Sequence, residues 1–530
     1  MSADSAVIRA SEAAGVATRF QDWKGVEHDI PEATQRAVLT ALGVRPEVPP
    51  RDPWLRSLPP CVVVQREFGG TLDVQVDAGA DAQVVFELED GGSQLAAQVT
   101  NDTPDREVGG RWRGQASFRI PEGLPLGYHT VRLTSRGRST TTRLIVTPAA
   151  APLPTALTNE RVWGFMAQLY SVPSKESWGV GDFADLATLG RWAAGLGADY
   201  VLINPIHAGG WVTPIENSPY LPSSRLFLSP LYIRPEDAPG YAELPVAGKG
   251  HIAELKLGLL AEVVESPHIE RDQAWLAKRT ALRRVFDAGM PARFQEEFDA
   301  FRAAKGQRLT YFAAWCVFSE LYGDDWRNWE PMLRNPASPQ TARTIAAHAT
   351  EVAFVEWLQW VADRQWAAAQ AAAKAAGMRI GIITDLAVGV SKGGADAWML
   401  ADSYASGITV GAPPDAYNQL GQEWGQPPWR PDRMAELGYQ PFVDVIRATL
   451  AHAGGVRIDH ILGEFRLWWV PEGLTSDQGT YVRCDHEALI GILALEAART
   501  GALVVGEDLG TIEPWVQGYL GGRGVLGTGV

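Results

Sequence analysis

Two short segments of the sequence deliver acidic residues at the point where a buried strand would end. The stretch Gly455-Val-Arg-Ile-Asp-His-Ile-Leu-Gly463 runs into Asp459, and Val504-Val-Gly-Glu-Asp-Leu-Gly510 runs into Glu507. Because side chains alternate along a strand, Arg457 and Asp459 are expected to point to the same side of it. A guanidinium group beside a carboxyl group favours the ionised form, which is the form that a covalent nucleophile requires.

Two carboxylates in different environments are the machinery of retaining glycoside chemistry. One forms a covalent glycosyl-enzyme, and the other alternately gives and takes a proton. Gly506 would leave room for a ligand beside Glu507. An aspartate at a strand end is also typical of helix caps and loop hydrogen bonds, so one segment alone does not decide between a structural and a chemical role. Together the two segments favour Asp459 and Glu507 as catalytic residues.

The residues around both segments alternate between predicted strands and predicted helices. Helical patterns cover 183–196 and 352–376, and apolar runs predict strands at 162–169, 200–203, 378–383, 456–459 and 503–505. This order predicts parallel βα units of an α/β fold. We expect a (β/α)8 TIM barrel over residues 149–530, with a helical insertion around 235–350 and with the chemistry at the carboxyl ends of the strands.

The first 148 residues have a different pattern. Residues 1–57 carry apolar positions at helical spacing and are expected to form a helical segment. Residues 58–148 change to short alternating runs separated by Gly and Asp clusters, which predict a β-sandwich domain. Three roles stay open for this sandwich: binding glucan, contacting a second subunit in a homodimer, and shielding the barrel.

Composition narrows the class of protein and the class of ligand. The net charge of −15 and the pI near 5.2 disfavour nucleic acid as a partner, whereas a neutral sugar is not penalised. Three cysteines without CxxC spacing signal neither a disulfide framework nor a zinc site. No signal peptide and no membrane-spanning run is found in the 530 residues, so a cytoplasmic protein is expected.

No cofactor is predicted. The segment Gly522-Arg-Gly-Val-Leu-Gly527 matches GxGxxG, but it lacks the preceding strand and the downstream acidic residue of a dinucleotide site. Nor is a metal predicted, because carboxylates alone can run glycoside chemistry.

Seven motifs, in order along the chain, resemble those of the amylomaltases, the 4-alpha-glucanotransferases of glycoside hydrolase family 77. The motifs are Ser177-Trp-Gly-Val-Gly-Asp-Phe183, Ser218-Pro-Tyr220, Asp385-Leu-Ala-Val-Gly389, Gly411-Ala-Pro-Pro-Asp415, Gly421-Gln-Glu-Trp-Gly425, Arg457-Ile-Asp-His460 and Gly506-Glu-Asp-Leu-Gly510. The similarity covers about 160–530, and the two N-terminal modules resemble those of the longer bacterial subgroup. One such motif is a weak signal, whereas the ordered series is highly specific.

The resemblance implies a (β/α)8 enzyme that cleaves an α-1,4-glucan and moves the released unit to the 4-hydroxyl of glucose or another maltooligosaccharide. Asp459 falls on the position of the family's nucleophile, and Glu507 falls on that of its acid/base. The third catalytic carboxylate of the family lies in a later His-Asp motif, and no such motif follows Glu507 before Val530. We therefore expect a truncated form of a longer protein, with the last barrel strands missing.

The candidate substrate-binding residues are Ser218, Tyr220, Asp385, Trp398, Asp415, Gln422, Arg457 and His460. The resemblance places the Ser-Pro-Tyr motif in the cleft, where an aromatic ring can stack on sugar C–H faces. It also implies that His460 contacts the sugar beside the cleavage point, which requires the strand to end there. Asp385 is expected either to bind sugar hydroxyls or to hold Arg457.

Two of these candidates share a predicted loop, and a third is a tryptophan. The segment 411–429 is too irregular for a helix, and in the family it covers the active site. Asp415 and Gln422 are expected there as substrate contacts or as residues that stabilise turns. Trp398 also has two interpretations, which are stacking on a sugar ring and packing in the protein core.

Two alternatives to the transferase are open from the sequence. A hydrolase of the α-amylase type could use the same carboxylates with water as acceptor. A glucan-binding pseudoenzyme is the other alternative, because of the absent third carboxylate and the β-sandwich.

Overall fold

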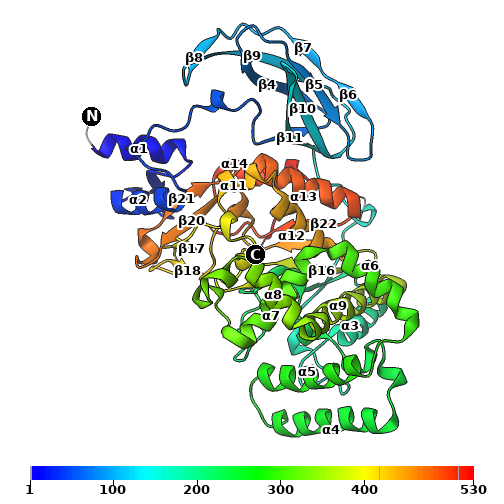
Figure 1. Ribbon diagram of the computed structural model, residues 1–530. Coiled ribbons are helices and arrows are strands. Elements are labelled where there is room, and N and C mark those ends of the chain that lie inside the picture. The colour runs from blue at the N-terminus through cyan, green and yellow to red at the C-terminus, as the bar shows by residue number, and fades with distance from the viewer. Residues whose placement is uncertain (1–2, 159, 417, 511, 530) are drawn as a thin grey trace.

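A computed structural model describes residues 3–158, 160–416, 418–510 and 512–529. The β-sandwich lies at one end of the molecule, an α/β region occupies the middle, and a group of helices extends from the other side (Figure 1). In these described ranges, no helix is both long and apolar enough to cross a bilayer.

The first segment of the chain is not wholly helical, contrary to the prediction for 1–57. It contains α1 (Ala3–Ala13), the hairpin strands β1 (Arg19–Gln21) and β2 (Glu27–Asp29), and α2 (Glu32–Ala41). Asp22 accounts for the hairpin turn, because its carboxylate accepts hydrogen bonds from the amides of Lys24 and Val26. Leu39 packs against Trp469 of the α/β region, so the segment is held on that region rather than standing apart.

Two sheets form the β-sandwich, in the orders β3-β11-β10-β5-β6 and β4-β9-β7, with β8 paired to β9. Their strands pair antiparallel except β3 and β11, which pair in parallel. The strands are β3 (Cys61–Gln65), β4 (Gly70–Asp77), β5 (Gln83–Glu87), β6 (Ser93–Leu95), β7 (Ala97–Val99), β8 (Arg106–Val108), β9 (Arg111–Ile120), β10 (Gly127–Ser135) and β11 (Arg138–Thr147). Phe86, Phe118, Val131 and Leu144 fill the core between the sheets. The sequence did not predict β9, in which Arg111 and Arg119 are exposed.

The sandwich contacts the α/β region through the outer face of its larger sheet. Ile145 of β11 packs against the core under α13 (His486–Thr500). The hydroxyl of Tyr128 donates to Glu496 of α13 at 2.5 Å, and the guanidinium of Arg143 lies 4.4 Å from the Tyr128 ring.

Five parallel strands form the central sheet, and their order in the sheet is their order in the chain. They are β12 (Gly164–Ala167), β13 (Tyr200–Ile203), β16 (Gly381–Leu386), β19 (Gly455–Ile458) and β22 (Leu503–Gly506). Every residue of β16 is buried, as expected for a strand covered on both faces. The sequence prediction of parallel βα units is confirmed, but the residues that the structure describes form this five-stranded sheet and not a closed eight-stranded barrel.

Helices α3 (Phe183–Gly195), α9 (Ala349–Ala375), α12 (Gln440–Leu450) and α13 cover the sheet. Asp182 starts α3 through a capping box with Asp185, so the first of the seven motifs ends in a helix cap. Arg234 pairs with both aspartates, which identifies this motif as a structural element.

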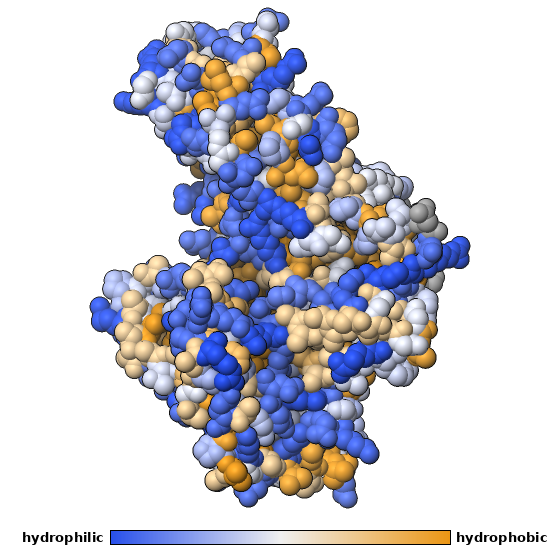
Figure 2. Space-filling model, turned by 90° about the vertical axis from the view of Figure 1, so that its right-hand side faces the viewer, coloured by the Kyte–Doolittle hydropathy of each residue, from blue (hydrophilic) through white to orange (hydrophobic). Residues whose placement is uncertain are grey.

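The insertion is helical, as predicted. Its helices are α4 (Val246–Val263), α5 (Arg271–Asp287), α6 (Gln295–Lys305), α7 (Gln307–Tyr322) and α8 (Pro339–Ala347). Helix α4 packs on α5 at the lower end of Figure 1, and it leaves Val246 and Leu257 exposed. Hydrophobic residues reach the surface at the lower end of Figure 2.

A second, antiparallel sheet lies beside the central one, in the order β18-β17-β20-β21. Its strands are β17 (Ile408–Ala412), β18 (Gln422–Glu423), β20 (Arg466–Pro471) and β21 (Thr480–Arg483). The other strands are β14 (His207–Ala208) and β15 (Ser224–Leu228), which form a hairpin, and the other α-helices are α10 (Ala395–Met399), α11 (Pro431–Glu436) and α14 (Pro514–Gly522). The segment 411–429, predicted as a long loop, therefore contains strand residues at two places. Its first two residues belong to β17, and β18 lies within it.

Candidate active site

Arg457 lies between two carboxylates at the carboxyl end of the parallel sheet. Its Nη1 atom donates to Asp459 Oδ1 at 2.9 Å and to Asp385 Oδ2 at 2.8 Å. Alternation along β19 places Arg457 and Asp459 on the same side, and the parallel register places Asp385 of β16 opposite Arg457. Both interpretations offered for Asp385 remain compatible with this position, and the structure gives it the Arg457 contact.

Burial dominates the ionisation of this group. Burial raises the pKa of Asp459, and the ion pair with Arg457 opposes that rise. Asp385 is 3% exposed, and burial raises the pKa of Asp385 to about 7 although Arg457 and the Tyr220 hydroxyl both favour its ionised form. Arg457 is thus the group that keeps a negative charge available at this strand end.

Glu507 lies at the end of the neighbouring strand. Ile458 and Gly506 are register partners in β19 and β22, so Asp459 and Glu507 occupy equivalent positions just past the two strands. Glu507 Oε2 accepts from the amide of His460 at 3.0 Å, and Oε1 accepts from the amide of Leu509 at 2.9 Å. These amides fix the carboxylate plane, and each oxygen keeps a second lone pair.

His460 turns the chain immediately after Asp459. Its φ of 48° is in the left-handed region, which non-glycine residues rarely adopt, and strand β19 has ended at Ile458. The turn brings the His460 ring to Trp424, with ring centroids 5.3 Å apart. Burial lowers the pKa of His460.

Gln422 bonds to Trp424, the residue whose ring lies against His460. The Gln422 Oε1 atom accepts from Trp424 Nε1 at 3.1 Å. Sequence reasoning did not single out Trp424, although it lies in the motif Gly421-Gln-Glu-Trp-Gly425. The signal that could have found it is an aromatic residue between two glycines in a loop over the cleft.

Tyr220 joins the same group of side chains from a loop before β15. Its hydroxyl donates to Asp385 Oδ2 at 2.8 Å, and burial raises its pKa, so it remains a donor. Ser218 is exposed, and its Oγ accepts from the amide of Tyr220 at 3.3 Å. The structure thus gives Ser218 a contact within the turn and gives Tyr220 a contact with the network of Arg457.

Asp415 holds a turn between β17 and β18. Its Oδ1 accepts from the amide of Asn418 at 2.6 Å, and its own amide donates to the Asn418 carbonyl at 3.0 Å. Of its two expected roles, these contacts are those of a turn residue.

Trp398 is not placed at the site, contrary to the expectation that it binds substrate. Its side chain is fully buried, its Nε1 donates to the carbonyl of Leu333 at 2.9 Å, and it packs edgewise against Phe318 and Trp329. The helical insertion covers this ring, and a sugar could not reach it without displacing α7.

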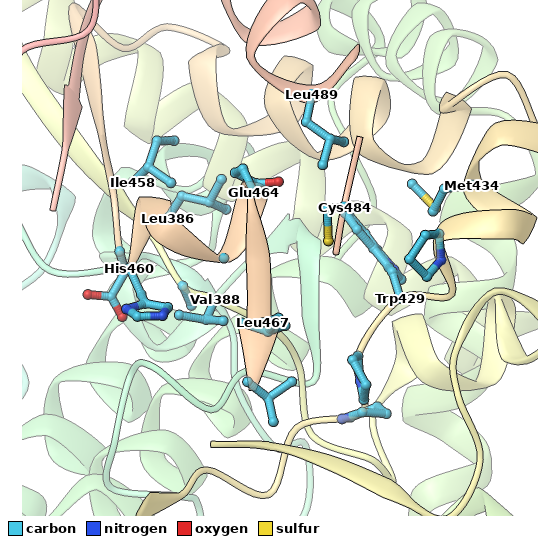
Figure 3. Close-up of a pocket in the computed structure, with 18 of the residues that line it drawn as sticks. Leu386, Val388, Trp429, Met434, Ile458, His460, Glu464, Leu467, Cys484 and Leu489 are labelled. Carbon is cyan, nitrogen blue, oxygen red and sulfur yellow. The ribbon is translucent and has the colours of Figure 1, made fainter. Parts of the chain in front are cut away.

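A pocket lies beside the His460 turn, and Asp459, His460 and Glu464 are among the residues that line it. Figure 3 shows its lining, with His460 on one side of the view and Trp429 and Met434 on the other. Glu464 faces this largely apolar pocket, and burial raises the pKa of Glu464 to about 7. Within the part of the chain that the structure describes, no group of three or more His, Cys, Asp or Glu side chains is arranged to hold a metal ion.

The site as a whole contains three carboxylates at the ends of adjacent strands, those of Asp385, Asp459 and Glu507. The Arg457 cation lies between the first two, and aromatic rings lie near them. Comparison with known sequences gives two family matches. The model described as 4-alpha-glucanotransferase matches residues 167–530, and the model described as the MalQ N-terminal beta sandwich domain matches residues 57–148.

Individual relatives agree with the family models. A 4-alpha-glucanotransferase of Mycobacterium tuberculosis is 48% identical over 534 residues, covering 97% of this chain and 74% of the relative. One from Haemophilus influenzae is 35% identical over 409 residues, covering 74% of this chain and 58% of the relative. The crystal structure of amylomaltase from Corynebacterium glutamicum superposes with a TM-score of 0.89 at 42% identity, covering 99% of this chain and 75% of that one. The resemblance drawn from the seven motifs is confirmed, and the chain belongs to the 4-alpha-glucanotransferase family, glycoside hydrolase family 77.

Proposed function

We propose that Asp459 is the nucleophile and Glu507 the general acid/base of a 4-alpha-glucanotransferase reaction on α-1,4-glucans and maltooligosaccharides. The observation that carries the proposal is the register of β19 and β22. Ile458 pairs with Gly506, and Asp459 and Glu507 are the residues that directly follow this pair. Adjacent strands lie about 4.8 Å apart. Retaining glycosidases hold their two carboxyl groups about 5–5.5 Å apart, so neighbouring strand ends suit a double displacement.

The first half of the reaction breaks the glycosidic bond. Asp459 attacks the anomeric carbon and forms an ester, while Glu507 gives its proton to the departing oxygen. Only Oδ1 of Asp459 accepts a hydrogen bond from the described residues, which leaves Oδ2 for the attack. The second half reverses these roles: Glu507 takes the proton from the 4-hydroxyl of the acceptor, whose oxygen displaces the ester.

The surrounding residues suit a sugar ring. We assign substrate contacts to Tyr220 and His460, and to Gln422 together with Trp424, because these side chains meet around the carboxylates. Asp415 would shape the covering loop rather than bind sugar directly. A loop that excludes water favours a sugar hydroxyl over water as acceptor, which separates a transferase from a hydrolase.

We also propose that the five-stranded sheet is part of a (β/α)8 barrel. Its strands are parallel and neighbour one another in chain order, as in such barrels, and helices cover its outer face.

Trapping the ester tests the assignment of both residues. In the full-length protein, Glu507→Gln removes the proton donor, but an α-maltosyl fluoride donor needs little acid assistance because fluoride leaves readily. We expect the maltosyl ester to accumulate and the peptide that contains Asp459 to gain the mass of the transferred unit. The matched variant Glu507→Gln with Asp459→Asn should carry no added mass.

Product analysis tests the reaction itself. Wild-type protein with maltotriose should yield glucose and a ladder of longer oligosaccharides at constant total reducing ends. A rise in reducing ends would indicate hydrolysis. Full transfer by Asp459→Asn would refute the proposed nucleophile.

A further inference from the structure

One buried residue, Gln426, contacts two of the segments that carry the sequence motifs and the residue directly before a third. The side-chain Nε2 atom of Gln426 donates to the backbone carbonyl of Tyr220 at 2.9 Å. The backbone carbonyl of Gln426 accepts from the amide of Val410 in β17 at 2.7 Å. Its side-chain oxygen lies against Gly389, where an added Cβ would come within 2.8 Å of Oε1. At 4% exposed, Gln426 lies beneath the cleft and is not itself positioned to touch a substrate.

The loop that carries Tyr220 has weak hydrogen bonds of its own. The amides of Tyr220 and Leu221 both donate to Ser218, each at 3.3 Å, which is long for this type of bond. The 2.9 Å bond from Gln426 is therefore the shorter restraint on the Tyr220 backbone.

The position of Tyr220 matters for the nucleophile. Its hydroxyl donates to Asp385, Asp385 accepts from Arg457, and Arg457 donates to Asp459. Hydrogen bonds of 2.8 to 2.9 Å thus connect Gln426 with the Tyr220 backbone, and the Tyr220 hydroxyl with Asp385, Arg457 and Asp459. The Tyr220 residue itself links the two sets of bonds.

The two polar atoms of the Gln426 side chain differ in their hydrogen bonding. Among the residues that the structure describes, its Oε1 atom is buried without a hydrogen-bond partner, which is unfavourable for folding. Buried polar atoms without partners are uncommon in native proteins and call for a specific reason. The bond to the Tyr220 carbonyl is the side-chain hydrogen bond through which Gln426 can act on the site.

We propose that Gln426 is a positioning residue for the nucleophile: by holding the carbonyl of Tyr220 it sets the hydroxyl of Tyr220 on Asp385, and through Arg457 it orients Asp459. This inference rests on the proposed function of Asp459. It assigns to the segment that follows β18 a role in aligning the catalytic group.

The test begins with Gln426→Leu in the full-length protein, measured by maltotriose disproportionation and thermal melting. The leucine cannot donate to the Tyr220 backbone carbonyl, so this carbonyl loses its bond from residue 426. We therefore expect kcat to fall about tenfold or more, with a smaller change in KM. Gln359→Leu is the matched control. Gln359 is also buried, and its amide makes two 2.9 Å bonds to the backbone of Leu228, outside the site. It should lower Tm without lowering kcat per folded molecule.

Gln426→Glu supplies a readout that a purely structural role would not change. A protonated carboxyl group can donate to the Tyr220 carbonyl, whereas an ionised one offers only acceptors facing it. We expect the activity of this variant, divided by that of wild type at the same pH, to rise as pH falls. The division removes the pH dependence that the variant shares with wild type through the neighbours Asp385, Asp459 and His460.

The outcomes separate this inference from the proposed function. If wild type transfers glucan but Gln426→Leu keeps its kcat, and the Gln426→Glu ratio is flat with pH, the positioning role is refuted while the assignment of Asp459 stands. If Asp459→Asn stays active, the proposed nucleophile fails first. Should Gln426→Leu not fold, the pH ratio of Gln426→Glu decides alone.

Discussion

Replacing Arg457 with methionine should move the acidic limb of the pH profile to higher pH. Asp459 must be ionised to attack, so transfer is lost as pH falls through the pKa of Asp459. Burial raises this pKa, and the Arg457 cation opposes the rise. Its Nη1 atom lies 2.9 Å from Asp459 and 2.8 Å from Asp385. Without the cation, a higher pH is needed to ionise the nucleophile.

The size of the shift follows from the geometry. Two unit charges about 4 Å apart interact by about 4 kcal/mol at an effective dielectric of about 20, equivalent to about 3 pKa units. Water reduces this effect, because the side chains of Arg457 and Asp459 are 19% and 24% exposed. Asp385 reduces it further, since burial already raises the pKa of Asp385 to about 7 and it would take up a proton once Arg457 is gone. We expect a shift of about one to two pH units.

Initial rates of maltotriose disproportionation against pH, in the full-length protein, check this prediction. Arg457→Lys keeps the charge and should move the limb less than Arg457→Met. Arg234→Met is the matched control, because Arg234 bridges Asp182 at 2.9 Å and Asp185 at 2.8 Å in the same manner at the start of α3. An unmoved limb in Arg457→Met, or an equal shift in Arg234→Met, would refute the reasoning.

Three further changes test the placement of other residues. Trp398→Ala should destabilise the fold by about 3–5 kcal/mol, because the ring is fully buried, and should leave KM for maltotriose nearly unchanged in the folded fraction. The pKa of Glu464 is raised from 4.5 to about 7, so wild type should lose about 3 kcal/mol of stability as pH rises through that window, and denaturant melts of Glu464→Gln should show less of this loss. Tyr128→Phe removes the bond to Glu496 and should lower stability by about 1 kcal/mol, with transfer rates unchanged.

Several features of the site follow from local sequence. Alternation along a strand was enough to put Arg457 and Asp459 on one side, and the bond between them follows. An apolar run ending in Glu507 was enough to place that residue at a strand end. The short alternating runs before residue 148 likewise predicted strands. These features depend on the period of side chains along the backbone, which a sequence displays directly.

Other features depend on contacts between distant segments. The pairing of Ile458 with Gly506 decides that Asp459 and Glu507 are neighbours, and no local pattern contains that register. The left-handed turn at His460 is maintained by the bond from its amide to Glu507, 47 residues later. Such a conformation is unfavourable locally, so local propensity could not predict it.

Trp398 is a residue whose role the sequence could not decide. An aromatic residue suits both a sugar face and a protein core, and the sequence is identical in the two cases. Because α7 packs over the Trp398 ring, the ring lies in the protein core and not at the sugar site. What the sequence by itself determined is the set of chemical groups and the faces of the elements that carry them; the tertiary structure alone decided which groups meet, because register, burial and loop closure are set by residues far apart in the chain.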